Sequence, residues 1–214
     1  MLQRNAQRGF TLVEIAIVMV IIGLLLGGAL KGYEMIENAK IKSLIKFQNE
    51  FKAAYYSYQD IYRAYPGDDI NANRFDGVGD NQVGNGDGQV TGNWRGADGN
   101  ETVLIWLHLL EAGLIAQYPQ ASDAQLPPGS SNSVVPRPTN AFGGVVGFEN
   151  NANELDMPVL CFDAIDDIVG RKIDIAYDDG NPATGTVFAT NRALSALKGV
   201  RTEYNRNGAL CFEF

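Results

Sequence analysis

Gly9-Phe10-Thr11-Leu12-Val13-Glu14 opens an apolar run that lasts to Leu30, and this stretch decides how the rest of the chain is organised. Glu14 is the only charged side chain from Phe10 to Leu30. At about 1.5 Å of rise per residue, a helix over this run is long enough to cross a bilayer core of about 30 Å. The sequence therefore predicts a transmembrane segment near the N-terminus.

The leader ahead of the apolar run, residues 1–9, carries charge only at Arg4 and Arg8. Because basic residues beside an apolar run stay in the cytoplasm, we expect the bulk of the chain on the opposite side of the membrane. An ordinary secretory signal is the alternative, with Gly27-Gly28-Ala29 as its small-residue cleavage site. The length of the apolar run and the charge of Glu14 within it argue against that alternative.

Glu14 is the anomaly of this segment. A carboxylate inside an apolar helix costs roughly 2.5–3.5 kcal/mol on insertion scales, and ionisable groups within a membrane normally have a partner. One interpretation places Glu14 near the membrane edge, where its charge is tolerated. The other gives it a cationic partner, a role that Arg8 could fill while the leader is present.

Gly9, followed by Phe10 to Glu14 and a continuous apolar helix, resembles the N-terminus of type IV pilins and type II secretion pseudopilins. The resemblance implies cleavage between Gly9 and Phe10 by a membrane prepilin peptidase, with N-methylation of Phe10. It also implies that Glu14 meets the N-terminal ammonium of a neighbouring subunit during filament assembly, which agrees with a buried carboxylate's need for a cation. Lys31 stands where the family commonly has a proline, so the family's helix kink stays open.

The resemblance also implies partners and a location. Expected partners are identical or related pilin subunits, the prepilin peptidase and an inner-membrane assembly platform. The expected location is the bacterial inner membrane, held by a single N-terminal helix with the head in the periplasm, and then a pilus or pseudopilus.

The length and net charge of the chain limit its number of domains and its possible partners. The chain has 214 residues, enough for one substantial domain and an anchor, and its formal net charge is −8. An acidic domain is a poor candidate for nonspecific nucleic-acid binding, which relies on lysine and arginine to neutralise phosphates. Nucleic acid is therefore not an expected partner.

Beyond Lys31 the apolar pattern narrows into a stripe at helical spacing that reaches Tyr62. We expect one helix from about Thr11 to Tyr62, whose first half lies in the membrane and whose second half packs on a globular head. Pro66 disfavours helical backbone at Tyr65, so the helix should end before these residues.

Residues 68–100 form the most polar and glycine-rich part of the chain. Calcium takes six to eight oxygen ligands from a flexible loop, and acidic residues separated by glycines supply them. One hypothesis is a calcium site built from Asp76, Asp80, Asn85 and Asp87, although the match to an EF-hand is only partial. The alternative is a solvated loop that holds no metal. Calcium is the only cofactor that the sequence suggests.

A second amphipathic segment, residues 102–113, predicts a buried helix with Gly113 as its C-terminal cap. The only histidine, His108, lies on this segment among leucines and without a nucleophile motif nearby. We interpret His108 as a structural residue, so no catalytic group is expected.

The C-terminal half favours strands. Expected strands cover residues 142–148, 157–162, 185–189 and 209–214, with a short helix near 163–175. Asn207-Gly208 is a strong hairpin signal between residues 200–204 and the last strand. The acidic pairs Asp166/Asp167 and Asp178/Asp179 are interpreted as solvated turn residues.

Cys161 and Cys211 are the only cysteines. An even count in an exported protein favours a disulfide, worth roughly 4 kcal/mol for a loop of about fifty residues. Two buried free thiols are the alternative.

These observations predict an α+β protein, in which a long N-terminal helix packs on a mostly antiparallel sheet. The expected organisation is a leader at 1–9, a transmembrane and filament-core half of the helix at 10–31, and the rest of the helix with the head at 32–214. The expected function is a structural filament subunit and not an enzyme. A type II secretion pseudopilin or a minor tip subunit is one alternative, and a membrane-anchored periplasmic enzyme or carbohydrate binder is another.

Overall fold

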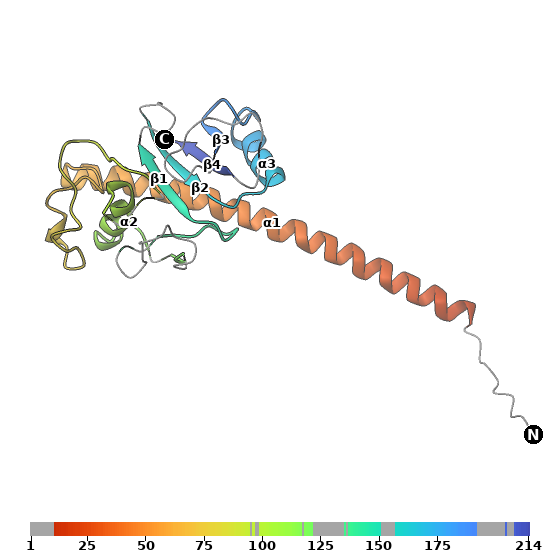
Figure 1. The fold of residues 1–214 in the computed structure, drawn as a ribbon. Coiled ribbons are helices and arrows are strands. Elements are labelled where there is room, and N and C mark those ends of the chain that lie inside the picture. The colour runs from red at the N-terminus through yellow and green to blue at the C-terminus, as the bar shows by residue number, and fades with distance from the viewer. Residues whose placement is uncertain are drawn as a thin grey trace, which may run out of the picture. The chain divides into compact units, whose positions relative to one another are not determined.

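The computed structural model describes residues 11–94, 96, 99–116, 118–121, 135, 137–150, 157–191, 204 and 208–214 (Figure 1). The chain divides into two compact units, Met1–Lys40 and Ile41–Phe214. Helix α1 (Leu12–Tyr62) contributes to both units. The other elements belong to the second unit: η1 (Ala72–Arg74), α2 (Glu101–Glu111), β1 (Val146–Asn150), β2 (Pro158–Phe162), α3 (Asp167–Tyr177), β3 (Val187–Asn191) and β4 (Gly208–Glu213).

The first unit consists, in its described part, of the apolar half of α1. The large apolar side chains between Leu12 and Leu30 are exposed. By length and composition, α1 is the one described helix that could cross a membrane. The predicted helix is confirmed to within one residue at its start and ends at Tyr62 as expected.

The second half of α1 supplies one wall of the head's core. Its buried residues recur at helical spacing, because only one side of the helix faces the sheet. Aromatic rings dominate this contact: Phe51 lies 4.8 Å from Trp106 and 5.8 Å from Phe148, measured between ring centroids. The buried α1 residues are Leu44, Phe51, Ala54, Tyr55 and Tyr58.

The four strands form one antiparallel sheet in the order β1-β2-β4-β3 (Figure 1). The last strand in sequence therefore lies inside the sheet, between β2 and β3. Most of the hairpin predicted between residues 200–204 and β4 lies outside the described residues, and in the described part β4 pairs with β2 on one edge and with β3 on the other. The α+β class with a long N-terminal helix is confirmed.

Two elements begin later than predicted. The strand expected from residue 142 begins at Val146, because the Asn140 side chain accepts the N–H groups of Phe142 and Gly144 and holds a turn there. The helix expected from residue 163 begins at Asp167, because Asp166 caps it by accepting the N–H of Ile168 at 3.1 Å.

Helix α2 ends in the way that the sequence predicts. Gly113 has φ of 69° and donates to Leu110, while Leu114 donates to Leu109. This pair of bonds is a Schellman motif, which needs a left-handed residue at the position that Gly113 occupies.

Both faces of the sheet are buried. Leu160 and Phe162 of β2 point to the core cluster that contains α1, whereas Val159 and Cys161 belong to a second cluster with Trp94. The predicted disulfide between Cys161 and Cys211 is present in this second cluster, and it joins β2 to β4.

Candidate assembly site and head loop

The start of α1 is capped by a reciprocal pair of side chains. The Thr11 hydroxyl accepts the N–H of Glu14 at 3.3 Å, and Glu14 Oε2 accepts the N–H of Thr11 at 2.9 Å. The Thr11 hydroxyl also donates to Glu14 Oε2 at 2.9 Å. This arrangement is a capping box, in which two N–H groups at the start of a helix are satisfied together.

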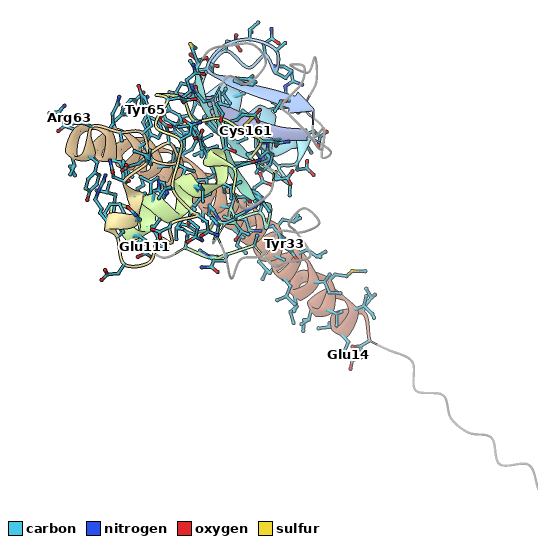
Figure 2. All side chains as sticks on the ribbon, turned by 60° about the vertical axis from the view of Figure 1, so that its left-hand side comes forward. Glu14, Tyr33, Arg63, Tyr65, Glu111 and Cys161 are labelled. Carbon is cyan, nitrogen blue, oxygen red and sulfur yellow. A yellow bond between two sulfur atoms is a disulfide. The ribbon has the colours of Figure 1, made fainter. Side chains whose placement is uncertain are left out.

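The capping role of Glu14 was missed by the sequence reasoning, although its signal was present. Thr11-Leu12-Val13-Glu14 is the threonine-x-x-glutamate pattern that precedes an apolar helix. Only one carboxylate oxygen takes part, since Oε1 has no hydrogen-bond partner among the described residues. Glu14 lies exposed at the end of the drawn helix (Figure 2), so this oxygen can accept a bond from another molecule.

Gly9 and Phe10, the predicted processing residues, lie outside the described residues. The comparison with family models bears on them directly. Residues 4–30 match the prokaryotic N-terminal methylation motif. Neither the curated proteins nor the solved structures gave a match.

The matched motif is the prepilin signature of type IV pilins and pseudopilins. The N-terminal part of the chain thus carries the prepilin signature, and the long apolar helix with its α+β head fits a pilin-like architecture. The motif implies processing by a prepilin peptidase and assembly in membrane machinery.

The acidic loop of the head is organised by buried carboxylates. Asp68 is 3% exposed and accepts three backbone N–H groups, from Gly86 at 2.7 Å, Asp87 at 3.1 Å and Gly88 at 2.9 Å. Burial raises the pKa of Asp68 above its usual range, while the N–H donors oppose that shift. Asp68 thereby holds the glycine-rich segment against the end of the 65–68 turn.

Asp69 connects the same loop to α1. Its carboxylate accepts a hydrogen bond from the hydroxyl of Tyr58 at 2.7 Å. It also accepts two hydrogen bonds from the guanidinium of Arg74, at 2.8 and 3.0 Å. Burial and the hydrogen bond to Asp69 raise the pKa of Tyr58, so this hydroxyl stays protonated and donates. A bidentate arginine contact adds geometric specificity as well as energy.

Glu101 and His108 complete the support from α2. Glu101 accepts the N–H groups of Asn85 at 3.0 Å and Thr91 at 2.7 Å. His108 Nδ1 accepts the N–H of Gly67 at 2.9 Å, so Nε2 carries the proton and faces the carbonyl of Gln82 at 2.8 Å. Burial lowers the pKa of His108, which favours this neutral tautomer. The contacts agree with a structural histidine.

The four predicted calcium ligands lie in this loop and are exposed. Asn85 accepts the N–H of Asp87 at 2.8 Å, and Asp87 accepts the N–H of Gln89 at 2.9 Å, so both side chains stabilise turns. Asp80 accepts a bond from Asn73 at 3.0 Å. Among the described residues, the carboxylates of Asp76, Asp80 and Asp87 do not form a group that could share one ion. A calcium site at these four residues stays a prediction.

Three aspartates lie close together elsewhere in the described part of the chain. Asp174, Asp178 and Asp179 place one oxygen each within 4.8 Å of one another. The buried Asp174 accepts the N–H of Gly180 at 3.0 Å and the hydroxyl of Tyr204, and burial raises its pKa. Asp178 accepts the N–H of Val187 at 2.8 Å. These bonds tie the end of α3 to β3.

Proposed function

We propose that this chain is a structural subunit of a type IV pilus or of a type II secretion pseudopilus. The observation that carries the proposal is the coincidence of the prepilin motif at residues 4–30 with an exposed apolar helix that continues into a folded head. Before assembly the apolar half of α1 anchors the subunit in the inner membrane, with the head in the periplasm.

Processing prepares the assembly surface. Prepilin peptidase cuts between Gly9 and Phe10, and Phe10 becomes the methylated N-terminus of the mature chain. Removal of residues 1–9 also removes Arg4 and Arg8, the cations of the leader. Glu14 is then left within an apolar helix and needs a new cation.

The N-terminal ammonium of a neighbouring subunit supplies that cation. In the capping box Glu14 uses Oε2 for Thr11, which leaves Oε1 to accept a bond from the neighbour. A charge-assisted bond is strongest where water is excluded, so this contact aligns one subunit with the next inside the filament core. During the same assembly step, the apolar side chains from Leu12 to Leu30 leave the lipid and pack against the helices of neighbouring subunits.

The function is structural and not catalytic. In the head, the contacts of Asp68, Glu101 and His108 hold loops in place, as expected of a structural role. Finding a prepilin peptidase gene and an assembly ATPase gene in the same genome would support this proposal over a membrane-anchored enzyme.

Intact-mass and N-terminal peptide analysis of protein from its native membrane tests the proposal. A chain that begins at N-methylated Phe10 is the expected result. A chain that begins at Met1 means a plain membrane anchor, and one that begins near Leu30 means an ordinary signal peptide. Either of the last two results overturns the proposal.

A further inference from the structure

An apolar groove of about 410 Å³ runs along the second half of α1. One wall is α1 itself, where Ala53 and Ser57 leave room because their side chains are small. Trp106 lies at the groove, and Leu114 and Tyr118 form the opposite wall. The α1 wall extends from Phe47 to Ser57, which is about 15 Å of helix.

An exposed apolar ridge lies on α3. Ile168 and Ile175 are each 62% exposed and stand two turns apart on the same face, about 10 Å along the helix. Their i, i+7 spacing is one at which a helix anchors its apolar face in a groove. At about 10 Å, the ridge is shorter than the roughly 15 Å of α1 that lines the groove.

The groove and the ridge lie at opposite edges of the sheet. Helix α2, which carries Trp106, packs on β1, and α3 packs on β3. Since the strand order is β1-β2-β4-β3, these two strands are the outer ones, as Figure 1 shows. The ridge of one head therefore cannot fill the groove of that same head.

Charges beside the two surfaces match. On α1, Lys46 and Glu50 are four residues apart and form an exposed ion pair at 3.4 Å. On α3, Asp167 and Arg171 are also four residues apart and exposed, and neither has an ion-pair partner among the described residues. If the two helices lie side by side in the same direction, Lys46 faces Asp167 and Glu50 faces Arg171.

We propose that the groove of one copy of this chain receives the α3 ridge of the next copy. The two surfaces differ, so the contact is heterologous and repeats from copy to copy, and it builds a filament where the rotation between copies does not close a ring. The inference rests on the proposed filament function and names the head surfaces that take part. An exposed ion pair contributes little, so the pair within α1 exchanges readily for pairs between copies.

Cysteine cross-linking in the native host tests this contact. The wild-type chain has no free cysteine among its described residues, because Cys161 and Cys211 form a disulfide. In the side-by-side alignment Ile175 of the following copy is level with Ala54, and Ala53 is the adjacent exposed residue of the groove. We expect the full-length Ala53→Cys, Ile175→Cys variant to give a ladder of dimers, trimers and longer species after mild oxidation.

Matched controls separate the proposed contact from chance collisions. Lys52→Cys with Ile175→Cys moves the probe by one residue to an exposed side chain outside the groove, near the Phe214 ring. That pair should give no ladder, and Ala53→Cys alone should give no dimer. A dimer from Ala53→Cys alone would mean that two grooves face each other, which overturns the proposal.

Reversing the charges at Glu50 and Arg171 tests the same contact independently. Glu50→Arg in the cysteine-pair variant places like charges together and should reduce the cross-linked fraction by roughly tenfold. Adding Arg171→Glu should restore most of it. Because both positions are exposed, neither change is expected to unfold the head.

The outcomes distinguish this inference from the filament function. If the variants are processed at Phe10 and form filaments but the Ala53–Ile175 ladder is absent, the contact is wrong and the function stands. If mass analysis shows no processing at Phe10, the proposed function fails. Cross-linking of either introduced cysteine to a different protein in place of a second copy also overturns the contact.

Discussion

Cys161 on β2 stands directly opposite Cys211 on β4, and their Cα atoms are 4.0 Å apart. The disulfide thus joins two strands that are 50 residues apart in sequence but adjacent in the sheet. Both sulfurs are buried under Trp94 and Phe188, on the sheet face away from α1.

Removal of this disulfide should cost the head much of its stability. The Cys161→Ala, Cys211→Ala variant is expected to lose about 2–5 kcal/mol of unfolding free energy, since the unfolded chain is no longer constrained by the loop. Urea unfolding of the purified protein measures the loss. A reductant should lower the stability of the wild type and leave that of the variant unchanged.

The two roles of Glu14 can be separated by two substitutions. Glu14→Gln keeps an oxygen for the Thr11 N–H but removes the charge, so processing at Phe10 should continue and filament yield should fall strongly. Thr11→Val removes the hydroxyl and keeps the carboxylate, and filament yield should remain near the wild-type value. Recovery of sheared filaments and N-terminal mass analysis give both readouts. Equal yields for Glu14→Gln and wild type would exclude the alignment role.

The support that Asp68 gives to the glycine-rich loop predicts a sensitive position. Asp68→Asn turns an NH₂ group toward at least one of three N–H donors, and an unsatisfied buried donor costs about 1–3 kcal/mol. Asp87→Asn is the matched control, because Asp87 is exposed and an amide oxygen can still accept the N–H of Gln89. Chemical denaturation should show a loss for the first variant and a change within about 0.5 kcal/mol for the second.

His108 makes the stability of the head depend on pH in a defined direction. Burial depresses the folded-state pKa below the unfolded value of about 6.5. The neutral ring of His108 therefore contributes fully to the unfolding free energy above about pH 6.5. This contribution is lost as the pH falls toward the lower folded-state pKa, because the unfolded chain binds a proton first. Through this one group, the unfolding free energy changes by at most about 1.4 kcal/mol per pH unit.

His108→Asn isolates that contribution. The amide oxygen can still accept the N–H of Gly67 but does not titrate. The stability difference between wild type and variant should shrink as the pH is lowered from about 7.5 to about 5.5, a range that brackets the unfolded pKa. A constant difference across this range would contradict the assignment.

Calcium binding by the loop is tested by thermal melting with and without added calcium. Binding to the folded state raises the melting temperature, so an unchanged value rules out a site at Asp76, Asp80, Asn85 and Asp87. If a shift is found, Asp80→Ala with Asp87→Ala should remove it.

The extent of α1 could be predicted from the sequence because a continuous apolar run passes into a stripe at helical spacing, with no proline before Pro66. Glu14 and the cysteine pair were predicted for similar reasons, since an isolated charge in an apolar run and an even cysteine count are local or compositional signals. The expected strands are also present, although their boundaries shift.

The strand order could not be predicted, because it depends on which edge is free when distant segments meet. Asn207-Gly208 favours a local hairpin, yet β4 gains more partners by pairing with both β2 and β3. The role of the loop carboxylates was hidden for a related reason. A sequence shows that Asp68 and Glu101 are acidic, but not that backbone N–H groups of residues 85–91 face them.

The position of β4 has a consequence for folding. Phe214, next to β4, packs with its ring centroid 5.8 Å from that of Phe51 and 5.7 Å from that of Tyr55. An inner strand of the sheet and part of the aromatic core therefore come from a segment that lies about 50 residues along the chain from its partner β2. Until β4 takes its place, β2 and β3 are not joined, and their edges are open to mispairing. Because contacts between distant segments form slowly, we expect this strand to set the pace at which the head folds.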